Sequence, residues 1–133
     1  MTLFEECLQA LGIEVRILSD NETSMIFNKF VSDFPVTSWG RVDWNKIHSK
    51  QHIKNSSEIL PFLKEKKGIN LDSEIYLLWN YSEAPSIIAK LHKAIAVKDD
   101  VTAVGSDTWF YDPELGYVVE FFHEGEITIG LKT

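Results

Sequence analysis

The segment that most constrains the fold is 105–130, where three stretches rich in aromatic and β-branched residues are separated by two turn signals. Alternation of side chains along these stretches is typical of strands. The strands are expected at 108–111, 117–122 and 126–131. A loop at 112–116 and a tight turn at Glu124-Gly125 join them. The segment therefore predicts an antiparallel meander.

Three helices are predicted by apolar residues that recur with helical spacing. The first spans 3–11, where Thr2 and Glu5 have the spacing of a capping box and Gly12 follows as a stop. The second begins at a similar Ser19-x-x-Glu22 box and ends at Pro35. The third begins between residues 55 and 57 and ends in a lysine-rich turn before Gly68.

Further strands are predicted at 13–18, 74–79 and 101–104. Residues 82–97 fit either one helix or a strand at 85–89 followed by a shorter helix from Lys90, and periodicity does not distinguish the two. Together these elements predict an α+β fold, with a largely antiparallel twisted sheet and helices packed mainly on one face. Such a sheet leaves an edge or a broad surface for a partner.

Composition indicates one globular domain over residues 1–133, because 44% of the residues are hydrophobic and 25% are charged. The net charge of −7 argues against nucleic acid or an anionic membrane as partner and fits a basic protein. No apolar run approaches the roughly 20 residues that a membrane span needs, and the first residues lack the basic start of a signal peptide. We therefore expect a cytoplasmic protein. The single Cys7 is expected in the core.

Catalytic and metal-binding motifs are sparse. His48 and His52 are four residues apart, but no nearby cysteine or carboxylate cluster completes a zinc site, so two solvated histidines in a polar connection are the expected outcome. The sequence Glu65-Lys66-Lys67 resembles part of a nuclease element, yet its place in a last helical turn is explained by the helix dipole. The sequence has neither a G-x-S-x-G elbow nor a glycine-rich phosphate loop. We expect no cofactor, metal or small-molecule ligand.

Tryptophans and one acidic residue are the candidates for binding. Trp79 ends an apolar strand and is expected in the core, whereas Trp39 and Trp44 are either interface anchors or scaffold. Arg41 and Asp43 between them could also form a local ion pair. Glu120 lies on a central strand among aromatic residues, so it must either pair internally or face a cation of a partner. An acidic edge would also include the following residues: Asp107, His123, Glu124 and Glu126.

Four segments carry a resemblance to a known family. They are residues 39–44, the strand that ends at Leu78-Trp79, residues 104–109, and residues 119–130. In these segments the chain resembles the immunity proteins of bacterial contact-dependent growth inhibition systems. The resemblance implies a protein that is not an enzyme and that neutralises the C-terminal toxin domain delivered by a neighbouring cell.

Charge and resemblance together favour a basic nuclease toxin whose active site or substrate-binding surface is blocked by an acidic, aromatic surface. The expected partner-binding residues are Trp39, Arg41, Asp43, Trp44, Asp107, Trp109, Tyr111, Glu120, His123 and Glu124. The alternative is a small metal-dependent hydrolase or nuclease that uses Asp107, Glu120 and His123. A third hypothesis is an interaction module unrelated to toxins.

Overall fold

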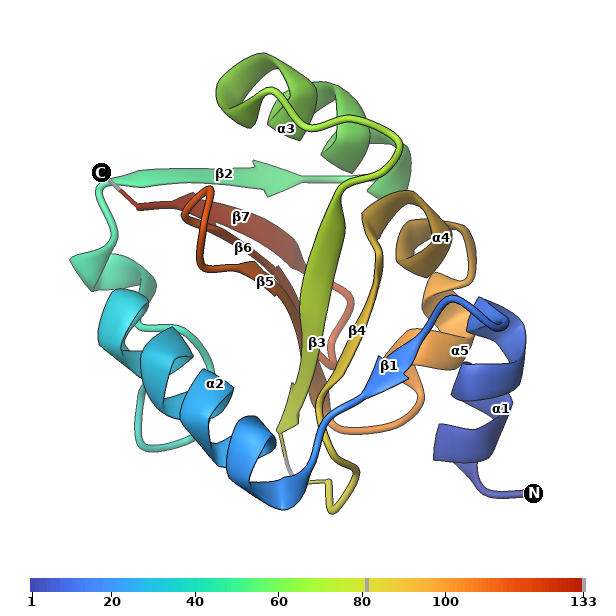
Figure 1. Cartoon of the computed structure of the whole chain (residues 1–133). Coiled ribbons are helices and arrows are strands. Elements are labelled where there is room, and N and C mark those ends of the chain that lie inside the picture. Colours follow the sequence, from blue (N-terminus) through green and yellow to red (C-terminus); the bar gives the residue numbers. More distant parts are fainter. Residues whose placement is uncertain (81, 133) are drawn as a thin grey trace.

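The computed structural model describes residues 1–80 and 82–132, and these residues form one seven-stranded sheet with five α-helices (Figure 1). The helices are α1 (Leu3–Leu11), α2 (Asp20–Asp33), α3 (Ile59–Lys67), α4 (Leu91–Ala96) and α5 (Lys98–Thr102), with 3₁₀ turns at η1 (Trp44–Lys46) and η2 (Ser56–Glu58). The strands are β1 (Arg16–Ile17), β2 (Ser49–Ile53), β3 (Glu74–Asn80), β4 (Ile87–Lys90), β5 (Asp107–Asp112), β6 (Tyr117–Phe121) and β7 (Ile127–Leu131).

The sheet has the strand order β1-β4-β3-β5-β6-β7-β2, and every neighbouring pair is antiparallel. Strands β5, β6 and β7 form the predicted meander, in which Glu120 lies opposite Trp109 on one side and Thr128 on the other. Strand β2 comes early in the chain but pairs with the last strand, β7. The prediction of an α+β fold with a largely antiparallel sheet is confirmed.

Two hydrophobic clusters cover the two faces of the sheet because side chains alternate along each strand. Helices α1, α3, α4 and α5 cover one face, which we call the helical face. Buried residues from these helices meet the strands there, and they include Cys7, Leu63, Leu91 and Val101. Trp79 also belongs to this cluster, and its indole Nε1 donates a hydrogen bond to the Val101 carbonyl at 2.9 Å. The core positions predicted for Cys7 and Trp79 are confirmed.

Helix α2 and the segment after it cover the opposite face, which we call the loop face. In Figure 1, α2 lies on one side of the sheet, whereas α1, α4 and α5 lie on the other. The Phe30 ring of α2 packs against Trp109 and Tyr111 of β5, at centroid distances of 5.0 and 5.2 Å. Both faces of the sheet are therefore covered, one by four helices and the other by α2 and the segment after it.

Local sequence signals fixed several elements. Both predicted capping boxes are present, at Thr2 with Glu5 and at Ser19 with Glu22, and Gly68 ends α3 in a left-handed conformation. Residues 87–90 form a strand and α4 follows directly, so the second of the two alternatives for 82–97 is correct.

Three local predictions need correction. The strand predicted at 13–18 is limited to Arg16–Ile17, and the strand predicted at 101–104 is wrong because Lys98–Thr102 is the short helix α5. Asp99 and Asp100 occupy the first turn of α5, where acidic side chains interact favourably with the helix dipole, and Val101 is buried in the cluster of the helical face. The region of His48 and His52, predicted as a polar connection, contains β2, an edge strand whose middle residues are exposed.

Candidate functional site

The segment 35–47, here called the Trp39 loop, crosses the loop face between α2 and β2. Val36 and Val42 form an isolated antiparallel bridge, and the Thr37 amide donates to the Arg41 carbonyl at 2.8 Å. Gly40 turns the chain with a φ of 94°, which side-chain-bearing residues rarely adopt. Trp39 lies next to this turn with 68% of its surface exposed. The loop therefore presents a large aromatic residue to solvent.

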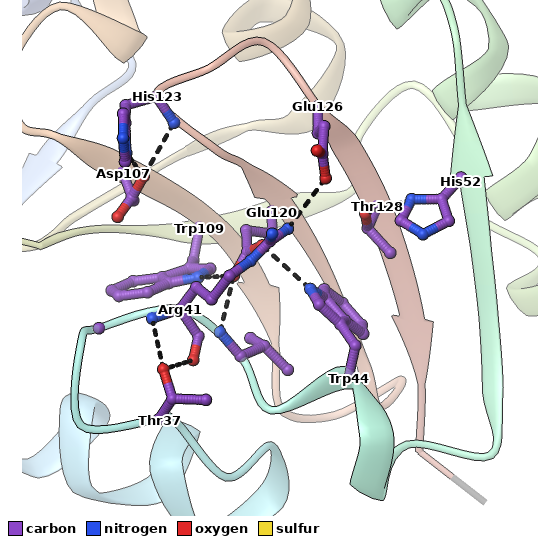
Figure 2. Close-up of polar contacts among 12 residues, drawn as sticks. Thr37, Arg41, Trp44, His52, Asp107, Trp109, Glu120, His123, Glu126 and Thr128 are labelled. Atoms are coloured by element: carbon purple, nitrogen blue, oxygen red, sulfur yellow. Dashed lines mark hydrogen bonds and ion pairs between the residues drawn. The ribbon is translucent and has the colours of Figure 1, made fainter.

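The carboxylate of Glu120, which has no exposed surface, lies beneath this loop (Figure 2). Its Oε1 accepts hydrogen bonds from Arg41 Nε at 3.0 Å, Arg41 Nη2 at 2.8 Å and Trp44 Nε1 at 3.0 Å. Its Oε2 accepts from the Val42 amide at 2.8 Å and Trp109 Nε1 at 3.1 Å. A buried carboxylate is stable only when its charge and lone pairs are matched, and these five bonds supply the match.

Arg41 connects the Trp39 loop to the turn between β6 and β7. Its guanidinium carbon lies 4.0 Å from the centre of the Phe122 ring, and Nη2 lies 3.5 Å from Glu126 Oε2. The side chain of Arg41 is only 19% exposed, whereas that of Glu126 is 53% exposed. Because it contacts both segments, Arg41 makes the Trp39 loop and residues 122–126 one continuous surface.

Residues 122–126, here called the acidic turn, are fixed from below by Asp107 of β5. Asp107 Oδ1 accepts a hydrogen bond from the His123 amide at 2.9 Å and lies 3.1 Å from His123 Nδ1. The carboxylate is 3% exposed and the imidazole 54%. Asp107 thus orients the turn, while His123, Glu124 and Glu126 face solvent.

The predicted partner-binding residues divide by exposure. Trp39, His123 and Glu124 are exposed; Arg41, Asp43 and Trp44 are partly buried; Asp107, Trp109, Tyr111 and Glu120 are buried. Of the two roles considered for Glu120, the structure shows internal pairing. Arg41 pairs with Glu120 instead of Asp43, which lies 3.8 Å from Lys46 Nζ. The buried residues support the surface from below.

Tyr111 lies away from the Glu120 carboxylate and connects β5 to the end of α2. Its hydroxyl donates a hydrogen bond to Asp33 Oδ2. Burial, together with the nearby Asp33 carboxylate, raises the pKa of the Tyr111 hydroxyl. Lys132 Nζ also lies 2.7 Å from Asp33 Oδ1, so this carboxylate joins three segments.

Residues that the sequence analysis missed also shape the site. The Asn80 side-chain amide donates to the Gly40 carbonyl at 3.0 Å and fixes the turn of the Trp39 loop. Gly130 of β7 leaves room for the Trp44 ring, because a Cβ there would lie 2.8 Å from Trp44 Cζ3. A glycine inside a strand often marks such a close approach, so this signal was present in the sequence.

Within residues 1–80 and 82–132, no group of three histidine, cysteine or acidic side chains is placed to hold a metal ion. His48 and His52 are exposed, and His52 Nδ1 lies 2.8 Å from Thr128 Oγ1. None of the helices in the described part of the chain combines the length and apolarity of a membrane span.

Comparison with protein families gave a match that extends over nearly the whole chain. The family described as "CdiI immunity protein EcoliA0-like" matches residues 1–130. The chain belongs to this CdiI immunity protein family. No curated protein matched the chain. Membership confirms the resemblance inferred from the sequence and implies a cognate toxin as the partner of this immunity protein.

Proposed function

We propose that this CdiI immunity protein binds and neutralises its cognate contact-dependent growth inhibition toxin without catalysing a reaction. The binding surface consists of the Trp39 loop and the acidic turn. Family membership supports the toxin as partner. The observation that supports the surface is the exposure of Trp39 on a loop that buried hydrogen bonds hold in one conformation.

An exposed tryptophan on an ordered loop has the properties of an interface anchor. Tryptophan is enriched among residues that dominate binding energy, and a fixed loop loses little conformational freedom on association. A specific interface buries about 800 Å² on each partner. The Trp39 loop and the acidic turn together supply aromatic, cationic and acidic groups for such an interface.

Charge favours a basic nuclease as the toxin. Nucleases hold phosphates and so present basic surfaces, and the immunity protein carries a net charge of −7. His123, Glu124 and Glu126 are exposed beside the Trp39 loop. Acidic side chains at this position can occupy the field that would otherwise attract a nucleic acid. We therefore propose that binding blocks the active site or the substrate-binding surface.

The alternative enzyme would use Asp107, Glu120 and His123, and the contacts of these residues favour structural roles. The Glu120 side chain has no exposed surface and accepts five hydrogen bonds from the protein itself. Asp107 is engaged by the backbone and ring of His123. Both oxygens of Glu120 are therefore occupied by donors of the protein itself, which leaves this carboxylate little capacity for a substrate or an ion.

The test is co-expression with the toxin domain encoded beside this gene, followed by growth measurement and co-purification. We expect protection with co-purification, and Trp39→Ala should weaken the complex by about 2 kcal/mol, which is roughly thirtyfold in Kd. Leu71→Ala is the matched control, because Leu71 is 72% exposed and lies outside the surface. Protection without co-purification would favour the alternative hypothesis of an enzyme. Unchanged binding by Trp39→Ala would show that the toxin binds at a surface other than the Trp39 loop.

A further inference from the structure

We propose that Glu120 is a positioning residue for toxin binding: its buried carboxylate holds the Trp39 loop in the conformation that the toxin recognises. This inference rests on the proposed function, because it concerns the same surface. Glu120 makes no contact with the partner and acts through the residues above it. The observation behind this role is that the Glu120 carboxylate accepts five hydrogen bonds, four of them from residues of the Trp39 loop.

The donors come from the Trp39 loop and from β5. Arg41, Val42 and Trp44 all follow the turn at Gly40, and all three donate to the same carboxylate. Trp109 donates from the neighbouring strand and fixes the orientation of Oε2. The carboxylate therefore sets the position of three loop residues relative to β5 and β6. Figure 2 shows Arg41 and the two indoles converging on Glu120.

Other contacts shape the turn of the Trp39 loop and fasten its ends. The bridge between Val36 and Val42 and the bonds between Thr37 and Arg41 shape the turn. Asn80 of β3 donates to Gly40, and Lys50 of β2 donates to the carbonyls of Trp44 and Ile47. None of these hydrogen bonds reaches β6, so without Glu120 the loop would keep its turn and lose its direct attachment to the centre of the sheet. It would then sample several positions, and the binding-competent one would be a fraction of the population.

Glutamine is the informative replacement for Glu120. An ionised carboxylate only accepts hydrogen bonds, and here all five incoming groups are N–H donors. Glutamine keeps the shape but replaces one oxygen with an NH₂ group, which would face N–H donors on either side. Glu120→Gln therefore disrupts the attachment with little change in volume.

The first measurement is made without the toxin. In Glu120→Gln, the indole N–H resonances of Trp44 and Trp109 should shift, and the Val42 amide should exchange faster with solvent. The indole of Trp79, which donates to the Val101 carbonyl on the helical face, is the internal reference and should not change. If the Trp44 and Val42 signals match the wild type, the carboxylate does not hold the loop and the inference is wrong.

The second measurement uses the toxin domain encoded beside the gene. Glu120→Gln should slow association about tenfold with little change in dissociation, because fewer molecules have the competent loop before encounter. Leu63→Ala is the matched control, since it destabilises the helical face without touching the loop. With both variants kept fully folded, a merely structural role for Glu120 would leave their association rates equal to the wild type.

The outcomes separate the inference from the proposed function. If Trp39→Ala weakens binding but Glu120→Gln associates at the wild-type rate, the positioning role is wrong and the surface stands. If neither variant affects binding, the proposed surface itself is wrong. Where Glu120→Gln does not fold, Trp109→Phe removes one buried donor and retains the carboxylate. It should raise Val42 exchange and slow association to a smaller extent, and unchanged values for both would contradict the inference.

Discussion

Buried carboxylates are the residues that join distant parts of this chain. Glu120 fastens the Trp39 loop to β6, Asp107 fastens the acidic turn to β5, and Asp33 fastens α2 to β5 and to Lys132. Each of the three carboxylates has an exposed fraction of at most 3%. Removing either partner of such a buried pair leaves an unmatched group, so these contacts set the positions of the segments they join.

The clearest pH dependence is expected at Asp33. Burial acts to raise the pKa of Asp33, but hydrogen bonds from Lys132, Tyr111 and Lys29 outweigh it, and the net pKa is lowered. Because the folded pKa lies below the unfolded value of about 3.9, this contribution is complete above that pH and is lost as the pH falls through the folded pKa. Asp33→Asn should lower the free energy of unfolding by about 1–3 kcal/mol at pH 7 and by less at pH 3.

Urea denaturation at the two pH values checks this prediction. Asp99→Asn is the control, because the Asp99 side chain is 94% exposed and should change stability by less than about 0.5 kcal/mol. An equal loss of stability for Asp33→Asn at pH 7 and pH 3 would contradict the ionic role of this carboxylate.

At the scale of elements, the Trp39 loop depends on how closely it lies against β7. Trp44 crosses Gly130 and places its Nε1 toward Glu120, and this arrangement requires a residue without a side chain in the strand. The two edge strands also have features that discourage pairing with another sheet. Strand β1 is only two residues long, and β2 carries the charged side chain of Lys50.

Replacement of Gly130 tests the contact between loop and strand. In Gly130→Ala, the new Cβ would lie 2.8 Å from Trp44 Cζ3, so the indole must move and its bond to Glu120 weakens. We expect a loss of about 1–3 kcal/mol in stability and weaker toxin binding. Thermal unfolding and a binding titration measure the two effects. Ile129→Val on the helical face is the control, and it should lower the free energy of unfolding slightly without changing the affinity for the toxin.

Elements with strong local signals were predicted from the sequence, and those that depend on distant partners were not. The capping boxes marked α1 and α2, and alternation marked β5, β6 and β7. Strand β2 has exposed side chains without alternation, and its partner β7 comes 76 residues later at the pair His52 and Thr128. Only that pairing makes it a strand.

The same distinction applies to the candidate site. A carboxylate on a central strand had to find a donor, and this much followed from the cost of burying a charge. The identity of the donor could not be predicted in the same way. Arg41 is 79 residues away in the sequence, and only the folded sheet brings it next to Glu120. Trp39 and Trp109 were both predicted to bind the partner, but Trp109 is buried because its ring packs against Phe30 of α2, whereas Trp39 is exposed.

At the scale of the whole molecule, charge is unevenly distributed. Residues 44–68 contain six lysines and two glutamates and so have a formal charge of +4. All other residues together carry −11, which gives the net charge of −7 for the chain. The basic segment includes β2 and α3, at one edge of the sheet. A basic toxin would therefore be repelled from that edge and attracted to the rest of the surface.

Salt dependence of association tests this orientation. The association rate with a basic toxin should fall as the NaCl concentration rises, because long-range attraction is screened. Combined Glu124→Gln and Glu126→Gln should slow association at low salt by a factor on the order of two to five. Lys64→Gln with Lys66→Gln is the control in the basic segment and should not slow it. An association rate independent of salt would contradict electrostatic steering.

The position of Glu120 also has a consequence for biosynthesis. The ribosome completes residues 35–47 early, but the acceptor that shapes them arrives with β6, and β7 follows before β2 gains its neighbour. A nascent chain that has emerged only through β5 thus displays Trp39 on a segment that still lacks its Glu120 acceptor. The surface proposed for toxin binding is therefore complete only after β6 has been synthesised and has joined the sheet.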